Sequence, residues 1–214
     1  MTIVQTAADA TDETRLSSAE RIRDAALRSF AIVGASATSL RTVAEAAGVS
    51  VGLVQHHFAN KAGLVKAVDD YVLGVVIAMV ARPISGPPAD SLNEMGSRIT
   101  QFVAAHSDIV DYFSRALIDG SPLGGMIFDT LVGNGTARWH ERIERGETRP
   151  DVDLTWAAIN SLVLALGTLM LRTHVERHLP EPLATPAQLD RWEASVNTLL
   201  REGLFRRIVD DQTF

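Results

Sequence analysis

The sequence of 214 residues contains no cysteine, only two lysines, and few aromatic residues, which make up 6% of the chain. The lack of cysteine excludes disulfides, thiolate metal sites and a cysteine nucleophile. The longest apolar run, 156–171, includes an asparagine and is shorter than the roughly 20 apolar residues that a membrane-spanning helix needs. We therefore expect no contact with a membrane, and we predict that this run forms a buried helix.

Motifs of enzymes are missing as well. Gly124-Gly125 lies in no phosphate-loop pattern, no nucleophile elbow is present, and His140-Glu141 is not followed by a histidine at the zinc-protease spacing. His174 and His178 stand four residues apart, which could hold a metal but is more typical of a solvated helix end. We expect no catalysis, no cofactor and no bound metal.

Charge is distributed unevenly along the chain, whose net charge is −6. Residues 15–80 carry 7 basic against 5 acidic side chains, whereas 81–214 carry 13 against 18. The polar stretch 1–17 does not follow the pattern of a signal peptide and is predicted to be a disordered tail of a cytoplasmic protein. The mildly basic part after it suits a polyanionic partner.

Two short helices joined by a glycine turn are predicted in the basic part. Ser39 can cap the first helix, Gly48 can take the left-handed conformation that ends it, and Ser50 can cap a second helix over 51–57. The first helix has apolar residues at the spacing of one buried face: Leu40, Val43, Ala44 and Ala47. This is a helix-turn-helix pattern, whose second helix enters the major groove of DNA.

The order Ser-x-Arg-x-Val-Ala-x-x-Ala-Gly-Val-Ser-x-Gly-x-Val-x-x-His-Phe-x-x-Lys-x-x-Leu, from Ser39 to Leu64, resembles the tetracycline-repressor (TetR) family of bacterial regulators. The resemblance covers about the first third of the chain, 18–68. Family members usually carry a tyrosine where this chain has Gln55, and a glutamine can instead read adenine or donate to a phosphate.

The motif assigns roles to nine residues. Contacts to base edges or nearby sugars are predicted for Arg41, Val51, Gly52, Gln55 and His56, and contacts to phosphates for Ser39, Ser50, His57 and Lys61. The alternative is that the two serines only cap helices and that His57 packs beside Phe58. Capping and phosphate contact are compatible, because a helix N-terminus favours an anion.

All periodic segments are helical, so we predict an all-α fold with a three-helix head at 18–64 and a helical body at 65–214. The nine expected helices cover 18–33, 39–47, 51–57, 61–81, 90–106, 108–119, 122–146, 152–178 and 186–209. Gly133 and Gly135 flank Asn134, and whether they break their helix stays open at this point.

Polar residues on apolar faces of the body are candidates for binding a small molecule. The candidate lining is His106 and Asn160, with Asn134 nearby, together with Phe102, Tyr112, Phe113, Met126, Trp139 and Trp156. They could form a mostly apolar cavity with a few polar groups, and the alternative is a packed core. The family resemblance implies a ligand pocket. Because the candidate lining is mostly apolar, we expect the effector to be largely apolar.

The final helix carries an apolar stripe of Leu189, Trp192, Val196, Leu199, Gly203 and Leu204, and the helix before it is apolar on more than one side. Extra cover is therefore expected, and the resemblance implies a homodimer through the last two helices. We predict a dimeric repressor that a small molecule releases from a palindromic double-stranded DNA operator. The alternative is a DNA-binding regulator whose body acts through protein contacts without an effector.

Overall fold

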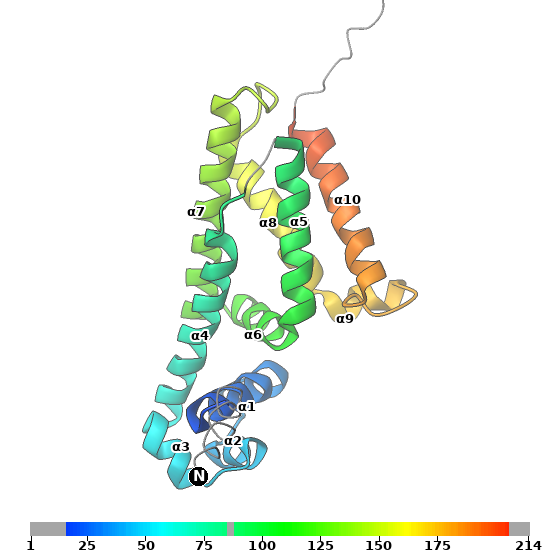
Figure 1. Ribbon diagram of the computed structural model, residues 1–214. Helices are drawn as coiled ribbons and strands as arrows, with labels where there is room; N and C mark the ends of the chain where they lie inside the picture. Colours follow the sequence, from blue (N-terminus) through cyan, green and yellow to red (C-terminus); the bar gives the residue numbers. More distant parts are fainter. Residues whose placement is uncertain (1–15, 85–87, 206–214) are drawn as a thin grey trace, which may run out of the picture. The chain divides into compact units, whose positions relative to one another are not determined.

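A computed structural model of the chain describes residues 16–84 and 88–205. Among these residues it contains ten α-helices, one short 3-10 helix and no strand, so the all-α prediction is confirmed (Figure 1). The helices divide into two compact units with a boundary between Tyr71 and Val72, inside one helix. The sequence prediction put the boundary after Leu64, and the predicted tail falls almost entirely outside the described residues.

The first unit comprises α1 (Ser18–Val33), α2 (Leu40–Ala47), α3 (Val51–Phe58) and the first half of α4 (Lys61–Ala81). Its core consists of fully buried apolar side chains from all four helices: Ile22, Phe30, Val43, Val54, Leu64 and Val68. The Arg23 guanidinium lies 3.8 Å from the centre of the Tyr71 ring. Contacts between α1 and α4 therefore reach as far along the chain as Tyr71.

Capping residues set the start of α1. The Ser17 hydroxyl accepts a hydrogen bond from the Glu20 backbone N–H, and the Glu20 carboxylate accepts one from the Ser17 N–H at 2.8 Å. This reciprocal pair is a capping box. The backbone hydrogen bond from Ser17 is the main cause that lowers the pKa of Glu20 below its ordinary value, followed by the serine hydroxyl.

The second unit contains the rest of α4 and the helices of the body. These are α5 (Pro88–Ala105), α6 (Ser107–Ile118), α7 (Pro122–Glu144), α8 (Leu154–Met170), α9 (Arg172–Val175), the 3-10 helix η2 (Glu176–His178) and α10 (Pro186–Leu204). Helix α7 packs against α6 and α8, and α10 runs beside α5 (Figure 1). The last helix was predicted to run to 209, but it ends at Leu204, because Phe205 adopts an extended backbone and pairs with Thr148 instead.

Helix α7 is continuous through Gly133 and Gly135, which answers the question that the sequence left open. A Cβ atom built at Gly135 would lie 3.4 Å from the Cβ of Ala158 on α8. The glycine therefore lets two helices approach closely, and this packing offsets a helix-propensity cost of about 1 kcal/mol per glycine.

The single helix predicted over 152–178 is wrong, because the chain bends by 71° between α8 and the segment α9–η2. The bend lies at Leu171, after which the Arg172 guanidinium pairs with the Asp111 carboxylate of α6 at 3.0 Å. The Glu176 carboxylate then accepts a hydrogen bond from the Leu183 N–H at 3.0 Å. These tertiary contacts turn the helix where the sequence shows no proline or glycine. No single helix in the described part of the chain is long and apolar enough to cross a membrane, although this bent pair passes together by length and composition.

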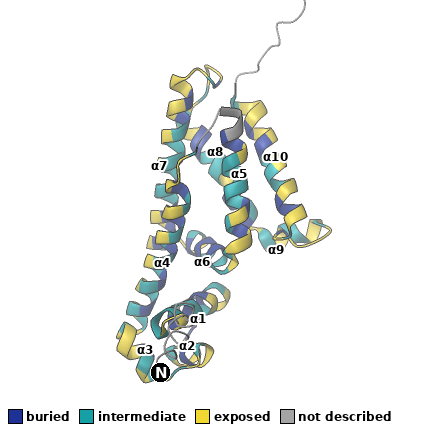
Figure 2. Cartoon of the chain, viewed as in Figure 1, coloured by how far each residue is buried: buried dark blue, intermediate teal, exposed yellow. Residues whose placement is uncertain are grey.

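The apolar stripe of α10 faces a different neighbour from the one predicted. Leu189 is buried within its own chain, and Trp192 and Val196 line an internal cavity of the second unit. Of the large apolar residues in the stripe only Leu199 is exposed, with 58% of its surface accessible. Figure 2 shows that α10 carries both buried and exposed residues along its length. The stripe is covered by α5 and α8 of the same chain, so most of it is not free to contact a second copy.

Candidate nucleic-acid interface and ligand cavity

Serine caps hold both helices of the helix-turn-helix, as the sequence predicted. The Ser39 hydroxyl accepts a hydrogen bond from the Thr42 N–H at 3.0 Å, and the Ser50 hydroxyl accepts one from the Leu53 N–H at 3.2 Å. Between the helices Gly48 has φ 66° and ψ 39°, the left-handed conformation that glycine adopts without a steric penalty. The turn therefore sets α3 at a defined angle to α2.

The front of α3 is open. Gly52 is exposed, and the atom nearest to a Cβ built there is the Ser50 hydroxyl at 3.8 Å. Val51 is half-buried, whereas Gln55 and His56 are exposed on the same short helix. Gln55 is not among the described residues with a side-chain hydrogen bond, so its donors and acceptor are available to another molecule.

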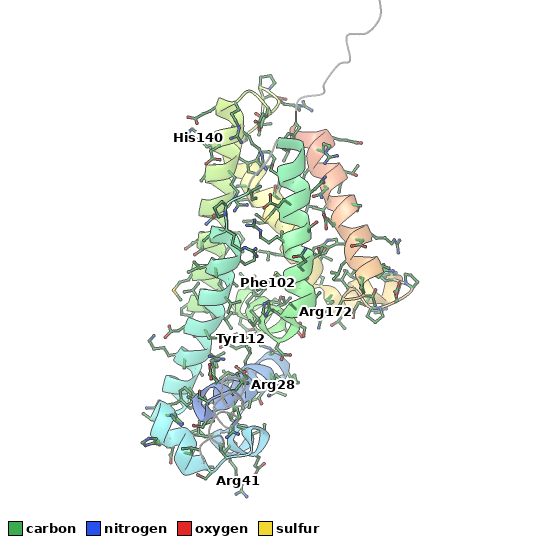
Figure 3. The ribbon with its side chains drawn as sticks, in the orientation of Figure 1. Arg28, Arg41, Phe102, Tyr112, His140 and Arg172 are labelled. Atoms are coloured by element: carbon green, nitrogen blue, oxygen red, sulfur yellow. The ribbon has the colours of Figure 1, made fainter. Side chains whose placement is uncertain are left out.

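Three of the predicted contact residues also bond within the first unit. The His57 Nε2 lies 2.8 Å from the Ser18 hydroxyl, the Lys61 ammonium donates to the Ser36 carbonyl at 2.8 Å, and Arg41 pairs with Glu45 at 3.1 Å. The Arg41 side chain points away from α2 into solvent (Figure 3). An exposed ion pair of this kind contributes at most about 1 kcal/mol. Arg41 and Lys61 therefore keep donors for an anion.

A largely apolar cavity of about 190 Å³ lies inside the second unit. It is partly open to solvent and is lined by α4, α5, α6, α7, α8 and α10, whose aliphatic and aromatic side chains form most of the wall. The polar groups of the wall are Thr100, Asn134, Arg138, Arg142, Ser161, Glu193 and Asn197. A mostly apolar enclosure with a few polar groups is the usual form of a small-molecule site.

The predicted ligand residues divide into two groups. Phe102, Phe113 and Trp139 line the cavity, as does Asn134. The other five are not among the lining residues. His106 precedes α6, with its ring 5.0 Å from that of Phe102; Tyr112 is buried elsewhere; Met126, Trp156 and Asn160 are exposed. Trp156 and Asn160 do not line the cavity because the opposite side of α8 faces it. That side carries Ala158, Ser161 and Leu162.

Comparison with known proteins agrees with this arrangement. The family model described as "Bacterial regulatory proteins, tetR family" matches residues 22–68, which contain the helix-turn-helix. The model described as "Tetracyclin repressor-like, C-terminal domain" matches residues 105–205, and the two together cover more than half of the chain. The chain belongs to the TetR family of transcriptional regulators. As a TetR-family member it is a DNA-binding regulator.

Individual relatives cover different parts of this TetR-family chain. The transcriptional regulatory protein RaaS of Mycobacterium tuberculosis is 33% identical over 134 residues, which are 62% of this chain and 60% of RaaS. The regulator BetI of Burkholderia thailandensis is 44% identical over 59 residues, 28% of this chain and 30% of BetI. The matched regions thus span less than two thirds of either relative. The structure of the ketosteroid regulator KstR2 of Mycobacterium tuberculosis shares the fold, with a TM-score of 0.69 at 19% identity over 90% of this chain and 97% of KstR2.

Sequence reasoning missed the charged groups of the cavity wall in this TetR-family chain. Arg138 and Arg142 belong to a segment, Arg138-Trp-His-Glu-Arg-Ile-Glu-Arg145, that reads as a solvated helix surface. Glu193 stands between two apolar residues of α10, and no motif around it indicates a binding role. Nothing local marks these residues, because their burial depends on which helices pack over them.

Proposed function

We propose that this protein is a ligand-responsive repressor, released from a palindromic operator by a small molecule that occupies the cavity of the second unit. The observation that carries the proposal is this cavity, lined by six helices in the same chain as an open helix-turn-helix. A core that served stability alone would be close-packed, since voids in protein interiors are few and small.

The DNA contacts of the proposal follow the exposure of the first unit. We assign contacts to base edges to four residues of α3 and one of α2: Val51, Gly52, Gln55, His56 and Arg41. The capped N-termini at Ser39 and Ser50, with His57 and Lys61, are assigned to phosphates, since helix N-termini and cations favour anions. Two such heads in a dimer would read major grooves about 34 Å apart.

Helix α4 connects the wall of the cavity to the head through one continuous stretch of chain. Its first half carries Leu64 and Val68 of the head core, and its second half carries Val76, Met79 and Val80 of the cavity wall. Suppose that the second half of α4 can take two positions and that the ligand binds the protein more tightly in one of them. The ligand then shifts the same helix that continues into the head. Such a ligand releases DNA only to the extent that its affinity differs between the DNA-bound and the free state.

We further propose a homodimer through α8 and α10. Trp156 and Val163 of α8 are each more than half exposed, as are Leu171, which directly follows α8, and Leu199 of α10. Large apolar side chains that recur at helical spacing on a surface indicate an interaction site. The interface therefore uses the outer face of α8 and only the exposed side of α10, not the buried stripe. As a regulator of bacterial operators the protein would act in the cytoplasm.

The test begins with genomic DNA fragments of the source organism. Purified protein is mixed with fragments, and those retained at fixed salt are sequenced, because affinities depend on salt. We expect enrichment of one palindromic site. Small molecules are then screened for release of that site, and a Leu166→Trp variant, which fills the cavity, should bind the site but resist release. Equal release from the variant would leave the alternative, a regulator that acts without an effector in this cavity.

A further inference from the structure

Two arginines line the mostly apolar cavity, and neither forms an ion pair with a carboxylate among the described residues. Arg138 and Arg142 are one turn apart on α7, and both contribute to the wall. Within the described residues no carboxylate oxygen lies within 4 Å of either guanidinium, although Arg142 is only 7% exposed. Buried charges in proteins are normally paired, because an unpaired one costs several kcal/mol. Among the residues that the structure describes, these two positive charges therefore lack the partner that such a site normally contains.

The hydrogen bonds of the two guanidinium groups are far from complete. Arg138 donates to the Val80 carbonyl at 2.8 Å and to the Met95 sulfur at 3.8 Å, and Arg142 donates to the Ser91 hydroxyl. Each guanidinium has five N–H donors, so most of them have no acceptor within the described part of the chain. The Arg142 guanidinium also lies 4.8 Å from the centre of the Trp139 ring, which holds it in place.

Electrostatics agrees with the geometry. Burial is the main cause that lowers the pKa of both arginines, and the positive charge of a neighbouring arginine lowers each pKa further, Arg98 for Arg138 and Arg138 for Arg142. Glu141 and Glu94 raise the pKa of Arg138, and Glu147 and Glu141 raise that of Arg142, from beyond hydrogen-bond distance. Both guanidinium groups stay charged, and an anion between them would relieve their repulsion.

Glu193 is the opposing charge of the wall, and two hydroxyl groups already donate to its carboxylate. Its carboxylate accepts hydrogen bonds from the Ser97 hydroxyl at 3.1 Å and from the Thr100 hydroxyl at 3.3 Å. The Trp192 indole N–H beside it is buried without an acceptor within the described residues. The unmet need of the cavity is therefore for acceptors, which an anion supplies and a cation does not.

We infer that the ligand of this cavity is an amphipathic carboxylate whose head group is bound by Arg138 and Arg142 and whose apolar body fills the rest. The inference rests on the proposed ligand-responsive function and names the chemical class of the effector. An apolar cavity of about 150 Å³ holds a benzene molecule. The cavity of about 190 Å³ in this protein is therefore suited to a body only a little larger, such as a chain of eight carbons.

Three probes with the same chain separate charge from apolar contact: octanoate, octan-1-ol and octylamine. Their binding to the full-length protein is measured by calorimetry at neutral pH. Because hydrogen bonds to charged groups are worth more than neutral ones, octanoate should bind about ten-fold or more tightly than octan-1-ol, and octylamine should bind most weakly. Octan-1-ol binding as tightly as octanoate, or octylamine binding more tightly, would overturn the inference without any variant being needed.

Variants then locate the head group. Arg138→Gln and Arg142→Gln should each weaken octanoate binding about ten-fold and leave octan-1-ol binding within about two-fold. Arg177→Gln removes one positive charge from an exposed site and should change neither affinity. Octan-1-ol binding combined with no preference for octanoate would overturn the carboxylate inference while the ligand cavity of the proposed function stands. Failure of all three probes to bind would overturn both.

Discussion

Replacing Gly52 by alanine separates the stability of the head from its ability to approach DNA. Gly52 is the second residue of α3, it is exposed, and only the Ser50 hydroxyl, at 3.8 Å, lies within 4 Å of a Cβ built there. The added methyl group therefore meets nothing in the free protein. If α3 enters a major groove, the same methyl group stands where the helix comes closest to DNA.

The two expected effects have opposite signs. Alanine is favoured over glycine by about 1 kcal/mol in a helix interior and by less in the first turn, so the free energy of unfolding should stay the same or rise slightly. Loss of one base contact costs about 1–3 kcal/mol, so operator affinity should fall by about 5- to 150-fold. A protein that is as stable as the wild type yet binds DNA poorly is the expected result.

Gly74 provides a matched control. It is also an exposed helical glycine with nothing within 4 Å of its Cβ position, but it lies in α4 outside the first unit. Gly74→Ala should raise stability by up to about 1 kcal/mol and leave DNA binding unchanged. Urea denaturation measures the first quantity, and fluorescence anisotropy with the retained operator fragment at fixed salt measures the second. Wild-type affinity in Gly52→Ala would show that the front of α3 does not approach DNA.

Three other substitutions test separate features. Lys61→Ala removes an ammonium that donates to the Ser36 carbonyl and has two further donors. The slope of the logarithm of the DNA-binding constant against the logarithm of salt concentration should become shallower by about one per lost phosphate contact on each subunit. An unchanged slope would show that Lys61 does not contact DNA. Ala59 adopts φ 60° and ψ −57°, a strained γ-turn, so Ala59→Gly should stabilise the head by about 1 kcal/mol in urea denaturation; a loss of stability would contradict this strain. Val163→Glu on the outer face of α8 should yield monomers in sedimentation, whereas Ile118→Glu, at an exposed apolar position of α6, should leave the dimer intact; a dimeric Val163→Glu protein would place the interface elsewhere.

The helix-turn-helix could be predicted from sequence because its determinants are local. Ser39 and Ser50 cap the helices that begin next to them, and Gly48 ends the first of these helices in the left-handed conformation. A cap acts on backbone groups two or three residues away, so the residues alone specify it. The same locality explains why the bounds of α1, α2 and α4 agree with the prediction to within a residue.

Which faces of the body are buried depends instead on contacts between residues far apart in the chain. Arg142 is buried because its guanidinium meets Ser91, 51 residues away, and lies beside the Trp139 ring. The bend at Leu171 is stabilised by the pairing of Arg172 with Asp111, 61 residues away. Helical spacing shows that a stripe of α10 is apolar but not which neighbour covers it. The sequence by itself therefore determined the family, the all-α class, the helices of the head and the DNA-contacting surface that we propose. Only the tertiary structure decided the walls of the cavity and their charge, because packing brings together groups that no local pattern connects.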